Sequence, residues 1–270
     1  MADIKRIAFL GGGNMAEAII KGLLRENSGV PLMVAEISAE RRAYLATAYP
    51  NIRIVENSSE AAAWGEIIIL AIKPQQATSV LATLERTLSP DKLFVSIMAG
   101  VRTSSIEEAL ENGTRVVRVM PNTPALVGLG ATAICPGRKA APLDLDRVES
   151  IFAQTGLVVR VEEKQMDAVT GLSGSGPAYV FTFIEALSDA GVKNGLSREI
   201  ASRLAVQTVL GAAHMLSETG EHPALLREKV TSPGGTTIAG LHIMENGRFR
   251  GVVMDAVDAA TQRSRELAGK

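Results

Sequence analysis

Residue types that build common metal and disulfide sites are scarce in this chain. Its 270 residues include one cysteine, Cys135, which excludes an intrachain disulfide and a cysteine-rich metal site. The three histidines, His214, His222 and His242, are widely separated, which argues against a histidine-based zinc site. The simplest interpretation of Cys135, within a β-rich run, is a buried small hydrophobic residue. We therefore expect no metal centre.

Net charge and long apolar runs are also lacking. A net charge of −1 gives no overall field that would attract nucleic acid or a membrane surface. No apolar stretch approaches the length needed to span a bilayer, and the N-terminal residues lack the apolar run and cleavage site of a signal peptide. With 46% hydrophobic and 21% charged residues, the composition is that of an ordinary globular protein. We expect a cytoplasmic protein without a nucleic-acid or membrane partner.

Short β-rich runs alternate with helical stretches up to about residue 163. Helical patterns cover Met15 to Asn27 and Ser38 to Ala48. Several β-rich runs are apolar on both faces, as in strands covered by helices on each side. This alternation predicts a doubly wound, mostly parallel sheet. The runs are 6–10, 32–36, 52–55, 66–72, 92–97, 115–120, 131–135 and 157–161.

After residue 163 the patterns are helical throughout. Apolar residues recur at helical spacing in 176–191, 200–216 and 249–267, and the first two segments are apolar around much of their circumference. We therefore predict an α/β domain over residues 1–163 and an all-α domain over residues 164–270. Such apolar helices favour a subunit interface, and a self-contained bundle is the alternative.

The first predicted strand leads into a glycine-rich fingerprint, Gly11-x-Gly13-x-x-Ala16. Gly11 permits a tight turn, Gly13 lets the backbone approach a pyrophosphate, and the helix that follows offers free N–H groups. Glu36, at the end of the second strand, stands where a carboxylate binds the ribose 2′-OH, which favours NAD(H) over NADP(H). Arg41 and Arg42 either compensate a 2′-phosphate or, as we expect from their helical position, remain solvated.

Three further strands end in segments that belong at the ligand-binding edge of such a sheet, 70–76, 96–100 and 119–125. Each could be only a strand-terminating turn. In the binding interpretation, Lys73 neutralises pyrophosphate charge. The residues predicted to bind the dinucleotide are Gly11, Gly12, Gly13, Asn14, Met15, Glu36, Ala71, Ile72, Lys73, Pro74, Met98, Ala99, Gly100 and Asn122.

A second glycine-rich turn, "SPGG" at 232–235, interrupts the helical half and is followed by two threonines. A turn of this kind that opens a helix can hold an anion or a carboxylate on free backbone N–H groups. The alternative is that the threonine side chains only cap the helix.

The ordered motifs "GGGNMA", "AIKPQ", "MPNTPA", "SGSGPAY" and "SPGGTT" span nearly the whole chain, which resembles the pyrroline-5-carboxylate reductases. The resemblance implies a Rossmann-type domain followed by a helical dimerisation domain, with dimers that can assemble further into a decamer of five dimers. It also implies that NADPH or NADH delivers hydride to the C=N carbon of 1-pyrroline-5-carboxylate, giving L-proline. Because the cofactor carries this chemistry, no nucleophile–base pair is needed.

The same resemblance assigns substrate residues. It implies that Thr237 places its hydroxyl at the ring nitrogen, where it can orient the iminium and donate as the charge is lost. Asn57 corresponds to a position on the adenosine side of the cofactor. Lys229 replaces an asparagine of some members and either pairs with the substrate carboxylate or faces solvent; Glu163 is either near the substrate or an exposed linker carboxylate. The substrate residues implied are Glu163, Ser175, Lys229, Ser232, Gly234, Gly235, Thr236 and Thr237.

Two other functions remain open. A 3-hydroxyacid dehydrogenase would use a lysine as acid and base, and Lys193 is the candidate, although "SPGGTT" would then have no role. A non-catalytic sensor of NAD(H) would bind the dinucleotide without reducing an imine.

Overall fold

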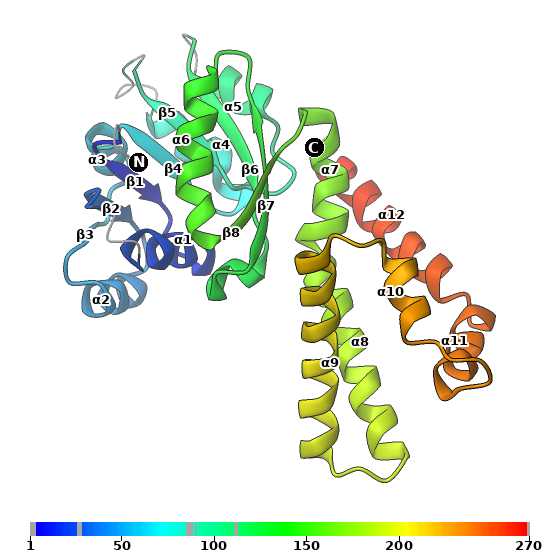
Figure 1. Ribbon diagram of the computed structural model, residues 1–270. Coiled ribbons are helices and arrows are strands. Elements are labelled where there is room, and N and C mark those ends of the chain that lie inside the picture. Colours follow the sequence, from blue (N-terminus) through cyan, green and yellow to red (C-terminus); the bar gives the residue numbers. More distant parts are fainter. Residues whose placement is uncertain (1–3, 26–28, 85–88, 90, 111–112, 269–270) are drawn as a thin grey trace. The chain divides into compact units, whose positions relative to one another are not determined.

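The computed structural model describes residues 4–25, 29–84, 89, 91–110 and 113–268 (Figure 1). The chain divides into two compact units: unit 1 is Met1–Ser175 with Ala259–Lys270, and unit 2 is Gly176–Asp258. The boundary predicted after residue 163 falls inside unit 1. Met166 is buried against Ala133 and Cys135 of the sheet, and Ser264 donates a 2.7 Å hydrogen bond to Asp167. The segment that contains Met166 and Asp167 therefore packs with the sheet, and the C-terminal segment that contains Ser264 packs with that segment.

Eight strands of the described chain form one sheet in unit 1, and each coincides with a predicted β-rich run. The order is β3-β2-β1-β4-β5-β6-β7-β8, with β7 antiparallel to β6 and the other described pairs parallel. The predicted doubly wound, mostly parallel sheet is therefore confirmed. The strands are β1 (Ile7–Leu10), β2 (Leu32–Ala35), β3 (Arg53–Val55), β4 (Ile67–Leu70), β5 (Leu93–Ser96), β6 (Arg115–Met120), β7 (Gly130–Pro136) and β8 (Gly156–Arg160).

Helices cover both faces of the sheet (Figure 1). Apolar side chains of α1 (Asn14–Arg25) and α6 (Pro142–Phe152) form one core with the strands, and those of α3 (Ser58–Trp64), α4 (Ala77–Leu84) and α5 (Thr103–Leu110) form another. The predicted helix at Met15 to Asn27 is confirmed through Arg25, since Asn27 lies outside the described residues. The remaining elements are α2 (Ala39–Ala48), η1 (Pro74–Gln76), η3 (Thr123–Val127), η4 (Ala153–Thr155), η5 (Glu163–Gln165), α7 (Met166–Val169) and the π-helical η6 (Thr170–Gly174).

Chain order positions a crevice in unit 1. From β1 the chain proceeds to β2 and β3 on one side, and then crosses to β4 on the other. The carboxyl ends of β1 and β4 therefore flank the point at which strand order reverses, where ligands bind in open α/β sheets.

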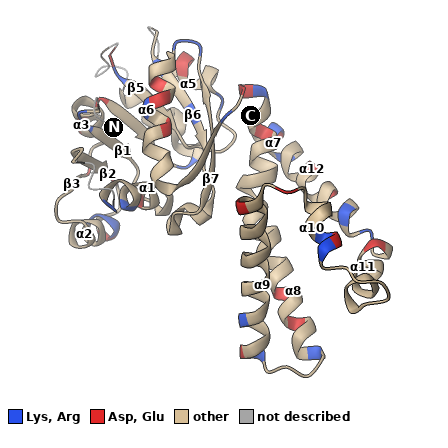
Figure 2. Ribbon diagram, in the orientation of Figure 1, with Lys and Arg blue, Asp and Glu red and all other residues tan. Residues whose placement is uncertain are grey.

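Unit 2 is helical and presents long apolar surfaces. It contains α8 (Gly176–Lys193), α9 (Arg198–Thr219), α10 (Pro223–Lys229), α11 (Thr236–Asn246) and the first part of α12 (Phe249–Ala268). The Ser188 and Ser202 hydroxyl groups lie 2.8 Å apart and join α8 to α9. Residues 204–217 of α9 include no charged Lys, Arg, Asp or Glu (Figure 2). Among the described helices, none is both long and apolar enough for a membrane span.

Candidate functional site

A cavity of about 350 Å³ lies where strand order reverses in unit 1. Six residues predicted to bind the dinucleotide line it: Gly11, Gly13, Glu36, Ala71, Ile72 and Lys73. The other lining residues were not predicted, and they are Ala35, Ile37, Ser38, Ser58, Gln76 and Val80. Ser38 lies two residues after Glu36 and Ser58 directly follows Asn57, and this proximity to predicted positions is the signal that could have found them.

At Gly11 the glycine-rich loop has a backbone conformation that other residues would not accommodate. Gly11 has φ +100°, and a Cβ atom there would lie 2.4 Å from the Ala71 carbonyl oxygen. A Cβ atom on Gly13 would meet no atom within 4 Å, so the backbone is uncovered at that point beside the cavity. Asn14 then begins α1, whose first N–H groups have no intrahelical partners. The Gly11–Gly13 loop and the start of α1 fit a pyrophosphate, because exposed backbone N–H groups and a helix N-terminus both bind anions.

Glu36 ties the end of β2 to the glycine-rich loop. Its carboxylate accepts hydrogen bonds from the N–H groups of Gly12 and Ser38, each at 2.9 Å. A carboxylate accepts about four hydrogen bonds, so these two leave capacity for a ligand hydroxyl.

Arg41 and Arg42 are only partly solvated, with 24% and 23% of their side chains exposed, and both hydrogen-bond to the protein instead of pointing freely into solvent. Arg41 Nε donates to the Gly12 carbonyl at 2.7 Å, and Arg42 Nη1 donates to the carbonyl oxygens of Glu36 and Ile37 at 2.9 and 2.8 Å. The turn after β2 exposes these carbonyl groups beside α2, which is a tertiary arrangement that helical periodicity does not reveal.

Asn57 and Asn122 hydrogen-bond within the protein. Asn57 Oδ1 accepts from the N–H groups of Ser59 and Glu60 and caps α3. Asn122 Oδ1 accepts from the Ala131 N–H at 2.8 Å, while its Nδ2 donates to the Ser173 carbonyl at 3.0 Å.

Nine residues that were predicted to bind the cofactor are not among the residues that line this cavity. Each lies within two residues of one that does or within four residues after the end of a strand, and Met98 is buried. They are Gly12, Asn14, Met15, Asn57, Pro74, Met98, Ala99, Gly100 and Asn122.

The "SPGGTT" turn of unit 2 joins α10 to α11. Gly234 has φ +68°, which favours glycine, and a Cβ atom on Gly235 would lie 2.3 Å from Ser232 Oγ. The Gly235 N–H donates to the Ser232 carbonyl at 3.1 Å, and Thr236 begins α11. Among the described residues no side chain caps this helix, whose N-cap is Gly235. The first N–H groups of α11 and the Thr237 hydroxyl therefore remain available.

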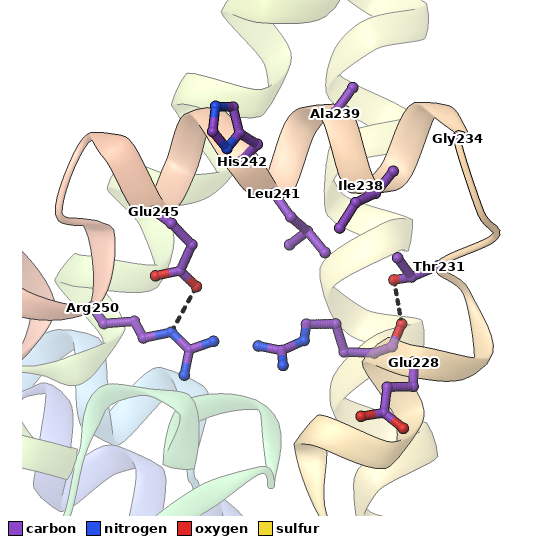
Figure 3. A pocket seen from close by; sticks show the side chains of 11 residues that line it. Glu228, Thr231, Gly234, Ile238, Ala239, Leu241, His242, Glu245 and Arg250 are labelled. Carbon is purple, nitrogen blue, oxygen red and sulfur yellow. Dashed lines mark hydrogen bonds and ion pairs between the residues drawn. The ribbon is translucent and has the colours of Figure 1, made fainter.

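A cavity of about 710 Å³ lies beside the same turn (Figure 3). It was not predicted, although Gly234 and Gly235 belong to its wall; Ser232, Thr236 and Thr237 do not line it. Arg250 Nε donates to Glu245 at 2.9 Å along one side. The lining residues are Arg227, Glu228, Thr231, Gly234, Gly235, Ile238, Ala239, Leu241, His242, Glu245 and Arg250.

Glu163 is a partly exposed carboxylate, with 32% of its side chain accessible, and it is paired within the protein. It accepts a 2.6 Å hydrogen bond from Arg118, a fully buried arginine on β6. The Cys135 thiol, confirmed as buried, donates to the other oxygen of Glu163 at 3.4 Å, and burial followed by this carboxylate raises the pKa of Cys135 to about 12. Sequence reasoning missed Arg118 because an arginine within an apolar strand is usually exposed.

Lys229 and Ser175 also have identified contacts. Lys229 Nζ lies 2.7 and 2.6 Å from the two carboxylate oxygens of Glu221. The Ser175 N–H donates to the Thr170 carbonyl at 2.9 Å, at the end of the π-helical turn. In the described part of the chain, no three His, Cys, Asp or Glu side chains cluster as metal ligands would.

Two family models match the chain. Residues 163–267 match the pyrroline-5-carboxylate reductase dimerisation model, and residues 6–100 match that of the coenzyme F420-dependent NADP oxidoreductases. The first match covers the helical half, and the second lies within the glycine-rich half.

Relatives match over nearly the full length. The pyrroline-5-carboxylate reductase of Synechocystis sp. is 47% identical over 98% of this chain and 99% of its own. The structure of the Coxiella burnetii pyrroline-5-carboxylate reductase has a TM-score of 0.93 at 37% identity, covering 98% of this chain and 99% of that one. A Plasmodium falciparum pyrroline carboxylate reductase with NADP bound has a TM-score of 0.88 at 36% identity, covering 99% of each chain. The chain therefore belongs to the pyrroline-5-carboxylate reductase family of oxidoreductases.

Proposed function

We propose that this enzyme reduces 1-pyrroline-5-carboxylate to L-proline, the last step of proline biosynthesis, with NADH or NADPH as the hydride donor. The observation that carries the proposal is the full-length similarity to relatives of that name, 47% identical over 98% of this chain. The two sites agree with it, because one fits a dinucleotide and the other offers N–H groups to a carboxylate.

The glycine-rich cavity of unit 1 would hold the cofactor, which supplies the hydride when it is bound. The backbone at Gly11 to Gly13 and the N-terminus of α1 would bind the pyrophosphate. Lys73 lines the cavity and would neutralise part of the phosphate charge. The ends of β4, β5 and β6 would surround the rest of the cofactor.

We infer that NADH is preferred. Glu36 lines the cavity, and its carboxylate would accept hydrogen bonds from a ribose 2′-OH and repel a 2′-phosphate. Arg41 and Arg42, the nearby cations, already donate to carbonyl groups of the protein. Because a Plasmodium falciparum relative has NADP bound, the two cofactors have to be compared directly.

The "SPGGTT" turn would bind the substrate carboxylate. The first N–H groups of α11 and the Ser232 and Thr236 hydroxyls would donate to it, and the positive end of the helix dipole adds to the attraction. Thr237 would contact the ring nitrogen, orienting the iminium and then donating to the nitrogen as its charge is lost. Glu163, Ser175 and Lys229 would complete the surroundings of the substrate.

Self-association of unit 2 is also proposed. Its residues lie within the region that matches the family's dimerisation model, and many of its large apolar side chains are exposed in the single chain. A homodimer would cover them, and five dimers would form the larger assembly. Light scattering coupled to size exclusion measures both states.

The experiment that tests the activity is loss of nicotinamide absorbance with 1-pyrroline-5-carboxylate, measured separately with NADH and NADPH. We expect turnover, faster with NADH. Dinucleotide binding without turnover would overturn the proposal and favour a sensor. The Lys193→Ala variant should keep most of its activity, since Lys193 is exposed at the end of α8, whereas a hydroxyacid dehydrogenase that used this lysine would lose it.

A further inference from the structure

We propose that Arg41 and Glu17 form a clamp that holds the glycine-rich loop in the shape required for dinucleotide binding, with Arg41 as the positioning residue. The proposal rests on the proposed function, because the dinucleotide is its expected ligand. Neither residue lines the cavity, and no sequence motif indicates that the two are paired.

The peptide groups on both sides of Gly12 are held. The Gly12 N–H donates to Glu36 at 2.9 Å, and its carbonyl accepts from Arg41 Nε at 2.7 Å. A trans peptide is planar, so its carbonyl and the following N–H point in opposite directions. By fixing the Gly12 carbonyl, Arg41 also fixes the direction of the Gly13 N–H.

This restraint matters because the loop is made of glycines. Glycine adopts positive and negative φ with similar ease, so the peptide between Gly12 and Gly13 could rotate at little cost if its carbonyl were released. Rotation would exchange an N–H donor for a carbonyl oxygen beside a phosphate site. A carbonyl dipole there repels the anion that an N–H group attracts.

Glu17 holds Arg41 in place. Glu17 lies on α1, is 6% exposed, and its Oε2 is 2.5 Å from Arg41 Nη2. The other carboxylate oxygen accepts from Tyr49 at 2.8 Å and Tyr44 at 3.0 Å. The guanidinium group also stacks over the Tyr44 ring, with 4.7 Å between Cζ and the ring centroid. Helices α1 and α2 therefore fix the arginine from two directions.

The alternative is that the pair only fastens α2 to α1. A fastener would change the unfolding temperature and leave ligand affinity alone, whereas a clamp on the loop changes dinucleotide affinity. Arg53, which pairs with Glu60 at 2.7 Å on an exposed part of the same unit, provides a matched control for loss of one arginine.

The test measures the dissociation constant of NADH by nicotinamide fluorescence, without the imine substrate, alongside thermal unfolding. We expect R41A to bind about tenfold more weakly than the wild type, the size expected for one charge-assisted hydrogen bond, and R53A to bind unchanged. Low concentrations of guanidinium ion should partly restore the affinity of R41A. Lysine can replace only one of the two contacts, so R41K should show a smaller loss.

Wild-type affinity in R41A, with only a lower unfolding temperature, would overturn the proposal, and so would equal losses in R41A and R53A. If R41A does not fold, R41K decides in the same way. The assay needs no turnover, so its outcome is separate from that of the proposed function. A wild-type protein that binds NADH but reduces no imine would refute the reductase proposal and leave the clamp intact.

Discussion

The two units bury their apolar residues to very different extents. In unit 1 the central strands are buried, and side chains such as Phe9 and Phe94 have no exposed surface. Of residues 176–258, all of which the structure describes, only Ser188, Ala201 and Ala205 are buried. Phe181, on α8, is 63% exposed. Unit 1 is thus complete within one chain, whereas unit 2 exposes the kind of apolar surface that marks an interface.

This difference follows from how the elements cover one another. A doubly wound sheet is covered by helices that the same stretch of chain provides, so each strand finds its cover locally. Helices such as α9, which has no Lys, Arg, Asp or Glu over 204–217 and exposes Leu204, Val206 and Leu210, have more apolar surface than α8 alone can cover. The comparison predicts that unit 1 is stabilised within the chain and unit 2 by association.

The largest expected effect concerns the core of unit 1. Phe94→Ala should lower the free energy of unfolding by about 3–5 kcal/mol, because a fully buried ring leaves a cavity. Urea unfolding at two protein concentrations measures the loss relative to the wild type, which should be the same at both. A loss that grows on dilution would contradict the view that unit 1 is complete by itself.

Phe181→Asp tests the opposite property in unit 2. In an isolated chain a substitution at a side chain this exposed would change stability little, but in a dimer interface it should cost about 2–4 kcal/mol. Light scattering should show dissociation at micromolar concentration. Leu143→Asp, at an exposed position on α6, is the control; equal behaviour of both variants would refute the assignment of the interface to unit 2.

Part of the loss of folding stability at low pH should come from Glu17 in unit 1. Burial alone would raise the pKa of Glu17, but hydrogen bonds from four side chains lower it from 4.5 to about 2; these are Lys21, Tyr49, Arg41 and Tyr44. Since the folded-state pKa is the lower one, the contribution is full above pH 4.5 and is lost as pH falls towards 2. The contribution amounts to about 3 kcal/mol.

The Glu17→Gln variant should lose this part of the pH dependence in urea unfolding between pH 5 and pH 2. Glu60→Gln, at an exposed ion pair of the same unit, serves as the control and should keep the wild-type slope. An unchanged slope in Glu17→Gln would show that the hydrogen bonds to Glu17 do not stabilise the folded state.

The smallest expected effect concerns Thr237 in unit 2, where a substitution should change the reaction rate and leave stability unchanged. Thr237→Val should lower kcat/KM for 1-pyrroline-5-carboxylate by about ten- to a hundredfold, the size of one lost hydrogen bond to a charged group. NADH affinity and unfolding temperature should stay unchanged. Thr208→Val, which removes a hydroxyl that bonds only to its own helix, should leave kcat/KM intact. An unchanged kcat/KM in Thr237→Val would show that this hydroxyl takes no part in the reaction.

Much of the fold was predictable because its signals are local. Each predicted strand is an apolar run between turn residues, and the fingerprint at Gly11 and Gly13 requires only a strand, a turn and a helix in succession. The predicted boundary after residue 163 differs from the observed units, because α7 and the end of α12 pack with unit 1 through Met166 and Ser264. Such packing joins residues far apart in the chain, up to 97 positions for Ser264 and Asp167, which periodicity does not report.

The sequence by itself determined where the strands and helices form, where two glycine-rich turns open helices, and which family the chain resembles. These depend on backbone preference and side-chain spacing within one segment. Only the tertiary structure decided that Arg41 holds Gly12, that Glu163 pairs with a buried Arg118, and that Asn122 joins Ser173 to Ala131. A polar side chain hydrogen-bonds to whichever group the fold brings within about 3 Å. That group usually belongs to a segment distant in the sequence, so the neighbouring residues do not reveal it.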